Sequence, residues 1–190
     1  MKENKHFKSI FREYDDVIFG VKDYFCNEII NTLPSHKLRI FLYKKVCGIS
    51  IGKDTSIGLH TVISDAANVS IGSNCAIGQF VYLDGRGGLT IGNNVNISGR
   101  TSIYTASHNH KSPRWEYIKS KTVIDDNVWI ASNSVVIQGI HIGKGSIVAA
   151  GSVVVKNVEN FDIVGGNPAK KISKRSRNIQ YITKYFPYFH

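Results

Sequence analysis

Two of the seven histidines, His108 and His110, lie one residue apart in a polar segment of the chain. A neutral histidine can remove a proton from a hydroxyl or an amine that attacks a carbonyl, and can return it to the departing group. Two close histidines are also compatible with a zinc site. The residues alone leave open whether His108 is a general base, a metal ligand or an ordinary surface histidine.

Aliphatic residues recur at a spacing of six, and the phase of this repeat shifts after Ile63, Leu83 and Ile103. A period of six fits neither a helix nor a continuous alternating strand. It predicts short strands joined by tight corners, with three strands closing one coil and coils stacked about 4.8 Å apart. A β-sandwich with unusually regular strands is the alternative. We call the recurring residues anchors; they are Ile51, Ile57, Ile63, Ile71, Ile77, Leu83, Ile91, Ile97, Ile103, Ile124, Ile130, Val136, Ile142 and Val148.

A long insertion interrupts this repeat next to His108. The anchor after Ile103 is due at residue 109, but the next one is Ile124. Solenoids accept insertions at their corners, and such loops often form the binding face. We therefore expect an ejected loop at residues 109–123 with His108 at its base.

The two flanks of the repeat have different patterns. Residues 1–48 place apolar side chains mostly at helical spacing, with a break at Pro34, and so predict an N-terminal helical cap. The coils are expected at residues 49–160 and a basic, aromatic C-terminal tail at residues 161–190. For this tail we expect a helix packed on the coils or on a neighbouring subunit, with peripheral membrane contact as the alternative.

Charge distribution, cysteine count and the N-terminal pattern exclude several classes of protein. The chain has 24 Lys and Arg against 14 Asp and Glu, a formal net charge of +10, and the excess is concentrated in the tail. The middle is nearly neutral and has no helix-turn-helix, RNP or zinc-finger pattern, so nucleic-acid binding is not expected. Three cysteines without a CxxC pair predict no disulfide framework. The sequence begins without a signal-peptide pattern, and we expect a cytoplasmic protein.

The tandem Ile-Gly-x-x-x-x units resemble the hexapeptide-repeat acyltransferases over about residues 49–172. This resemblance implies an all-β fold, a left-handed parallel β-helix shaped as a triangular prism, which assembles as a homotrimer with active sites between subunits. The segment Thr105–His108 is similar to the Thr-Ala-x-His motif of the galactoside and maltose acetyltransferases. The resemblance therefore implies that His108 is the catalytic base, with His110 as its competitor.

Three further segments resemble the donor site of the same family. They are 125–132, with Val-Trp-Ile-Ala-Ser, 149–156, with Ala-Gly-Ser-Val-Val-Val-Lys, and 165–170, with Gly-Asn-Pro-Ala-Lys. They imply that acetyl-CoA is the co-substrate and lies in a groove between two prisms, near Trp129, Ser132 and Ala150, with its phosphates at Lys156 and Lys170. The histidine spacing of the zinc-binding carbonic anhydrases with this prism is absent, so no metal is expected.

The acceptor side departs from the family pattern. Gly78, beside Gln79, occupies the position of the asparagine that lines the acceptor pocket of the galactoside and maltose enzymes, and Arg86 occupies that of their acidic ligand. We expect an acceptor to contact Asp84 or Arg86, with Gln79 and His110 as further candidates, and an arginine there could meet a phosphate or a carboxylate. The alternative is that residues 83–89 form only a glycine-rich corner.

Residues 34–49 resemble the leaders of capsule, O-antigen and exopolysaccharide O-acetyltransferases. The predicted function is therefore acetyl-CoA-dependent O-acetylation of a sugar hydroxyl in cell-envelope polysaccharide biosynthesis. N-acetylation of a nucleotide-linked amino sugar and O-acetylation of an antibiotic are the alternatives within the enzyme class. A trimeric β-helix scaffold without catalysis is the alternative outside it.

Overall fold

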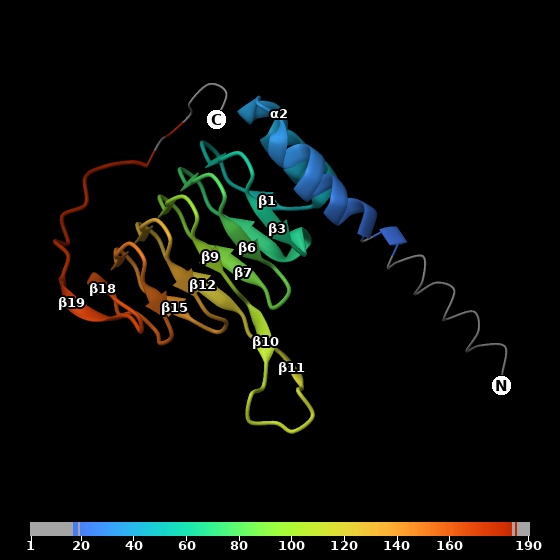
Figure 1. Cartoon of the computed structure of the whole chain (residues 1–190). Coiled ribbons are helices and arrows are strands. Elements are labelled where there is room, and N and C mark those ends of the chain that lie inside the picture. The colour runs from blue at the N-terminus through green and yellow to red at the C-terminus, as the bar shows by residue number, and fades with distance from the viewer. Residues whose placement is uncertain (1–16, 19, 184, 186–190) are drawn as a thin grey trace.

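A computed structural model describes residues 17–18, 20–183 and 185 of the chain. The chain winds in successive coils, and the stacked strands of these coils form three mainly parallel sheets (Figure 1). The first sheet contains β1 (Ser50–Ile51), β4 (Val69–Ile71), β7 (Leu89–Ile91), β12 (Thr122–Ile124) and β15 (His141–Ile142). The second contains β2 (Ser56–Ile57), β5 (Ala76–Ile77), β8 (Asn96–Ile97), β13 (Trp129–Ile130), β16 (Ile147–Val148), β18 (Asp162–Gly165) and the antiparallel β19 (Lys170–Lys174). The third contains β3 (Val62–Ser64), β6 (Tyr82–Asp84), β9 (Ser102–Ile103), β14 (Val135–Val136) and β17 (Val153–Val154).

The anchors stack directly on one another from coil to coil. Ile51 pairs with Ile71, which pairs with Ile91, and this ladder continues through Ile124 to Ile142. All of the anchors are buried, and each buried aliphatic side chain contributes about 1.5–3 kcal/mol relative to an exposed one. The predicted parallel β-helix of hexapeptide repeats is therefore confirmed.

Small hydroxyl residues that lie four places after an anchor donate hydrogen bonds to backbone carbonyls at the corners. Thr55 Oγ1 donates to the Gly72 carbonyl at 2.7 Å, and Thr61 Oγ1 donates to the Gly78 carbonyl at 3.0 Å. Both threonines are buried. Because a buried carbonyl without a partner is costly, these hydroxyls stabilise the turns between sheets.

A helical segment covers the first coil (Figure 1). Residues 17–18 and 20–24 are α-helical and lead into η1 (Phe25–Ile29), η2 (Ile30–Thr32), α2 (His36–Leu42) and η3 (Tyr43–Cys47). Asn27 makes two hydrogen bonds with the backbone of Ile63, and Arg39 Nη2 donates to the Ile57 carbonyl at 2.9 Å. These contacts occupy strand edges that would otherwise be open. The part of the predicted cap within residues 1–16 lies outside the described residues.

The C-terminal tail differs from the helix expected for it. After β18 the chain turns back as β19, and residues 175–183 then run along the prism without helical structure (Figure 1). Arg175 Nη1 donates to the Asn127 carbonyl at 2.9 Å, and Asn94 Nδ2 donates to the Tyr181 carbonyl at 3.0 Å. The expectation of a helix was wrong, because the tail backbone is extended and makes its hydrogen bonds with polar groups at one corner of the prism. Residues 186–190 lie outside the described residues.

Candidate active site

The insertion after β9 forms a hairpin that projects from the prism (Figure 1). Its arms are β10 (Ala106–His108) and β11 (Tyr117–Lys119), which pair antiparallel with His108 opposite Tyr117. The strand β12 then returns to the first sheet, where Ile124 pairs with Ile91. His108 therefore lies on the first arm, three residues beyond the buried Thr105 of the prism wall.

The hairpin fixes the orientation of the His108 ring. Its Nδ1 lies 3.0 Å from the carbonyl oxygen of Trp115, and its ring stacks on the Trp115 ring with centroids 4.9 Å apart. The Tyr117 ring lies against it at 5.4 Å. Because a carbonyl can only accept, this hydrogen bond requires the proton on Nδ1. The lone pair of the neutral ring is then on Nε2, where a general base needs it.

His108 faces a cavity of about 400 Å³ between the hairpin and the third sheet. Val135 and Ile137 supply apolar wall, and Arg86, Ser107 and Gln138 supply polar groups. His110 is exposed and is not among the residues that line this cavity. The geometry therefore favours His108 over His110 as the base.

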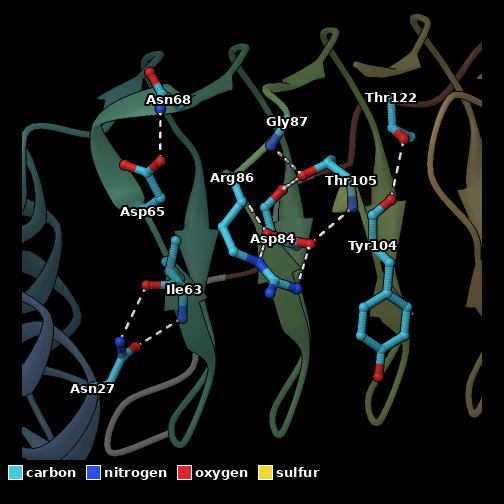
Figure 2. A network of polar contacts seen from close by, with 10 residues as sticks. All are labelled: Asn27, Ile63, Asp65, Asn68, Asp84, Arg86, Gly87, Tyr104, Thr105 and Thr122. Atoms are coloured by element: carbon cyan, nitrogen blue, oxygen red, sulfur yellow. Dashed lines mark hydrogen bonds and ion pairs between the residues drawn. The ribbon is translucent and has the colours of Figure 1, made fainter. Parts of the chain in front are cut away.

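A buried carboxylate holds the first arm of the hairpin (Figure 2). Asp84 is fully buried, accepts from Arg86 Nε at 2.8 Å and Nη2 at 3.0 Å, and accepts from the backbone N–H of Thr105 at 2.9 Å. Burial alone would raise the pKa of Asp84, but the hydrogen bonds from Arg86 and the backbone of Thr105 and Arg86 outweigh it and leave the pKa lowered. The side-chain hydrogen bonds to the Asp84 carboxylate raise the pKa of Arg86, so the pair stays ionised.

Thr105 joins this carboxylate to both arms. Its Oγ1 donates to the Asp84 carbonyl and accepts from the N–H of Gly87, and its own carbonyl accepts from Ser120 after β11 (Figure 2 shows the first two). A Cβ at Gly87 would lie 2.1 Å from the Thr105 carbonyl oxygen, so only glycine permits this approach. In this chain Asp84 contacts structural partners, whereas Arg86 reaches the cavity.

Gln79 lies in a different place from His108. It lines a second cavity of about 350 Å³ with His36, Gly78 and Tyr185, at the corner after the second sheet. The two cavities share no lining residue among those described. One chain therefore does not bring Gln79 together with His108 and Arg86.

The donor candidates are spread over several parts of the prism. Trp129 projects from the second sheet, is 42% exposed, and donates from Nε1 to Ser98 Oγ at 3.1 Å. Ser132 and the exposed Ala150 stand on adjacent coils at the following corner, where the Ser132 carbonyl accepts from Gly151. Lys156 follows the third sheet, and Lys170 begins β19; both are exposed.

The described residues contain no group of three or more His, Cys, Asp or Glu side chains that could hold a metal ion. The three cysteines are free. Nor is any helix in the described part of the chain long and apolar enough to cross a bilayer.

Comparison with known proteins identifies the family. The model "Bacterial transferase hexapeptide (six repeats)" matches residues 121–156, and "Hexapeptide repeat of succinyl-transferase" matches residues 48–85. The structure of a hexapeptide-repeat containing acetyltransferase from Vibrio cholerae is 32% identical, covers 85% of this chain and 92% of its own, and superposes with a TM-score of 0.76. The chain belongs to the hexapeptide-repeat acetyltransferases. The predicted family membership is thus confirmed.

Other relatives of the chain are named for different acceptors. A maltose O-acetyltransferase from Clostridium difficile 630 is 26% identical, covers 87% of each chain and has a TM-score of 0.70. A chloramphenicol acetyltransferase from Klebsiella aerogenes is 56% identical over 54 residues, which are 28% of this chain and 26% of that protein. The chain matches between about a quarter and a half of the first curated relatives.

Sequence reasoning did not find the residues that surround His108. Trp115, Tyr117, Tyr104 and Gln138 line the cavity or contact the histidine, and none of them is an anchor. An aromatic pair seven and nine residues after a candidate base was the available signal. This pair contacts His108 only because of the register of the hairpin, and the hexapeptide repeat does not predict that register.

Proposed function

We propose that this acetyltransferase transfers the acetyl group of acetyl-CoA to a hydroxyl, with His108 as general base. The observation that carries this proposal is the contact of His108 Nδ1 with the Trp115 carbonyl, which leaves Nε2 free to accept a proton beside a cavity of about 400 Å³. Acetyl-CoA is present in a crystal structure of the Vibrio cholerae relative, which is 31% identical and has a TM-score of 0.73.

The proposed reaction is a direct transfer. The acceptor oxygen loses its proton to His108 Nε2 and forms a bond to the acetyl carbon, and the carbon–sulfur bond breaks. The leaving thiolate then takes the proton from His108, so the base returns to its neutral form. The stacked Trp115 ring and the paired Tyr117 hold the imidazole in place during both steps.

The donor residues suit an extended, phosphorylated ligand. The backbone near Ala150 is exposed, and a Cβ at Gly151 would meet nothing within 4 Å, so a pantetheine chain can approach it. Lys156 and Lys170 supply exposed cations for phosphates. We infer that Trp129, Ser132, Ala150, Lys156 and Lys170 bind the donor.

A complete site would require a second copy of the chain. Gln79 and His108 line separate cavities at different corners of the prism. A homotrimer that sets one subunit's hairpin against the next subunit's second sheet would join them, and we propose this assembly. The free cysteines fit our inference of a cytoplasmic enzyme, since that compartment keeps thiols reduced.

We propose a sugar hydroxyl of a cell-envelope polysaccharide as the acceptor. The maltose O-acetyltransferase neighbour and the half-exposed Arg86 and Tyr104 at the cavity support a polar, oxygen-rich acceptor. A neighbouring N-acyltransferase from Bacillus cereus, 27% identical with a TM-score of 0.64, was crystallised with dTDP and an acyl-CoA. An amino sugar on a nucleotide is therefore the second candidate, and an antibiotic hydroxyl the third.

The decisive experiment measures thiol release from acetyl-CoA with sugar, amino-sugar and antibiotic acceptors. His108→Ala should lower kcat by about 10² to 10⁴, because it removes general-base assistance, and should leave acetyl-CoA affinity nearly unchanged. His110→Ala is the matched control and should retain turnover. Near-normal turnover of His108→Ala would disprove the assignment of the base.

The scaffold alternative is tested separately by a thermal-shift titration with acetyl-CoA. A ligand that binds only the folded protein raises its apparent stability, by about 2.7 kcal/mol at one hundred times Kd. The absence of any shift in the wild-type protein would favour the scaffold.

A further inference from the structure

The helical cap presents an apolar stripe to solvent, and one edge of it, at Ile18, borders a cavity against Ala66 and Ala67 of the prism. Six apolar residues of the α-helical segment at 17–18 and 20–24 and of η1, together called the first helix, are 38–61% exposed. At 100° per residue they fall within an arc of about 140°, the width of a face that helices normally bury, and the exposed Glu28 lies within the same arc. On the opposite side, Cys26 of η1 and Ile30 of η2 are buried and Asn27 bonds to Ile63. The exposed residues are Val17, Ile18, Val21, Tyr24, Phe25 and Ile29.

The neighbouring helix α2 and the turn η3 have a second outward face of mixed character. Their inner side buries Arg39 and Tyr43 against the first coil. The outer arc carries two exposed apolar side chains, Leu38 at 45% and Phe41 at 56%. Three exposed lysines share this arc at helical spacing, and they are Lys37, Lys44 and Lys45.

The charges around these faces are mainly positive. Besides the three lysines of the outer arc, Lys22 lies at the edge of the first stripe and is exposed. Two acids lie on the first helix: Glu28 is exposed, and Asp23 accepts a hydrogen bond from Asn27 at 3.2 Å. The net field at the cap therefore favours a negatively charged surface.

We propose that the outer face of this cap binds the surface of a bilayer that contains anionic lipid. Exposed aromatic and aliphatic side chains on one face of a helix, flanked by lysines, lie in the interface between headgroups and acyl chains. Each lysine near such a surface adds electrostatic attraction. A second copy of the chain is a poorer occupant, because the centres of protein interfaces are depleted in lysine. The proposal does not depend on the acceptor, and it places the membrane contact on the cap instead of the C-terminal tail.

The test is co-sedimentation of the full chain with phosphatidylcholine vesicles, with and without about a third phosphatidylglycerol. We expect binding to the anionic vesicles that weakens between 0.1 and 0.5 M salt, since salt screens the charges. The double variant Phe25→Ser/Phe41→Ser should bind at least tenfold more weakly, because it removes apolar surface from the interface. Replacing Lys37, Lys44 and Lys45 by Gln should weaken binding by about fivefold for each charge, on anionic vesicles only.

The matched control is Ile172→Ser/Ile182→Ser, which removes two side chains of the tail that are 64% and 67% exposed. This variant should bind vesicles like the wild type. If it alone loses binding, or if the wild type binds neither vesicle, the proposal is overturned. Sedimentation velocity without lipid tests the other occupant: a lower oligomeric mass of Phe25→Ser/Phe41→Ser would assign the face to a subunit interface. Thermal unfolding of each variant shows whether it is folded.

Discussion

The stacked coils and the hairpin at residues 106–119 are held in different ways. All anchors in the coils are buried, and those of the inner coils are paired with an equivalent residue above and below, as Ile91 is between Ile71 and Ile124. In the hairpin all of β11 is exposed, and Trp115 is 64% exposed. A few polar contacts, chiefly those of Asp84 and Thr105, connect the two regions. Stability should therefore depend mainly on the coils, and catalysis mainly on the hairpin.

The largest effect on stability is expected in the ladder of the first sheet. Ile91→Ala should lower the free energy of unfolding by about 3 kcal/mol, because it removes a buried aliphatic group and leaves a cavity among fixed neighbours. Thr90→Ala, the outward neighbour on β7, is the control and should change it by less than about 0.5 kcal/mol. Chemical denaturation at one protein concentration measures both. Equal effects of the two variants would contradict the assignment of Ile91 to the inside and Thr90 to the outside of the prism.

The next effect is expected at Asp84, where the two regions meet. Asp84→Asn removes the charge that Arg86 and Thr105 surround, and should lower the free energy of unfolding by about 2 kcal/mol near pH 7. The pKa of Asp84 is lowered in the folded chain, so its stabilisation is present above the unfolded pKa of about 3.9 and is lost as pH falls toward the folded value. The difference between wild type and variant should therefore shrink below about pH 4.

The control for this change is Asp65→Asn on the preceding coil. Asp65 accepts a surface hydrogen bond from Asn68 at 2.8 Å, and it should contribute less than about 0.5 kcal/mol (Figure 2). Turnover separates a structural from a binding role. If Asp84→Asn keeps its stability and raises only KM for the acceptor, Asp84 is an acceptor ligand, as the sequence suggested.

The same contrast explains what the sequence could reveal. Each coil repeats one environment, so the anchors appear at a fixed period and predict the fold without knowledge of any contact. The insertion after Ile103 also identifies where the hairpin leaves the prism. The contacts within the hairpin occur once, and the carbonyl that His108 meets belongs to Trp115 because of an antiparallel register that no period records.

The sequence shows that residue 84 is an aspartate, but it does not show whether the carboxylate points into the cavity or into the protein. A carboxylate in a glycine-rich corner fits an acceptor ligand as well as it fits a buried anchor. The decision depends on Thr105, whose N–H and hydroxyl reach Asp84 from the adjacent coil. The course of the tail depends likewise on corner asparagines, such as Asn94, that are distant in the sequence.

A smaller effect is expected from the aromatic ring that supports His108, the proposed base. Trp115→Ala keeps the backbone carbonyl but removes the stacked ring, which should cost about 1 kcal/mol of positioning and lower kcat about fivefold. Trp115→Phe should retain most of the activity, because it keeps an aromatic face. The unfolding midpoint should not move, since the ring is mostly exposed. A loss of stability without a loss of kcat would place Trp115 in the structural region instead.

The smallest effect is expected at Trp129, on the proposed donor side of the prism. Ser98→Ala removes the hydroxyl that accepts from Trp129 Nε1 at 3.1 Å, and so frees the indole to rotate. Because one hydrogen bond contributes about 0.5–1.5 kcal/mol, acetyl-CoA affinity measured by calorimetry should fall about two- to tenfold while kcat stays constant. Ser70→Ala, an outward serine of the first sheet, should leave affinity unchanged. A fall in kcat at unchanged affinity would show that Trp129 acts on the chemical step, because a residue that only orders the donor affects its binding.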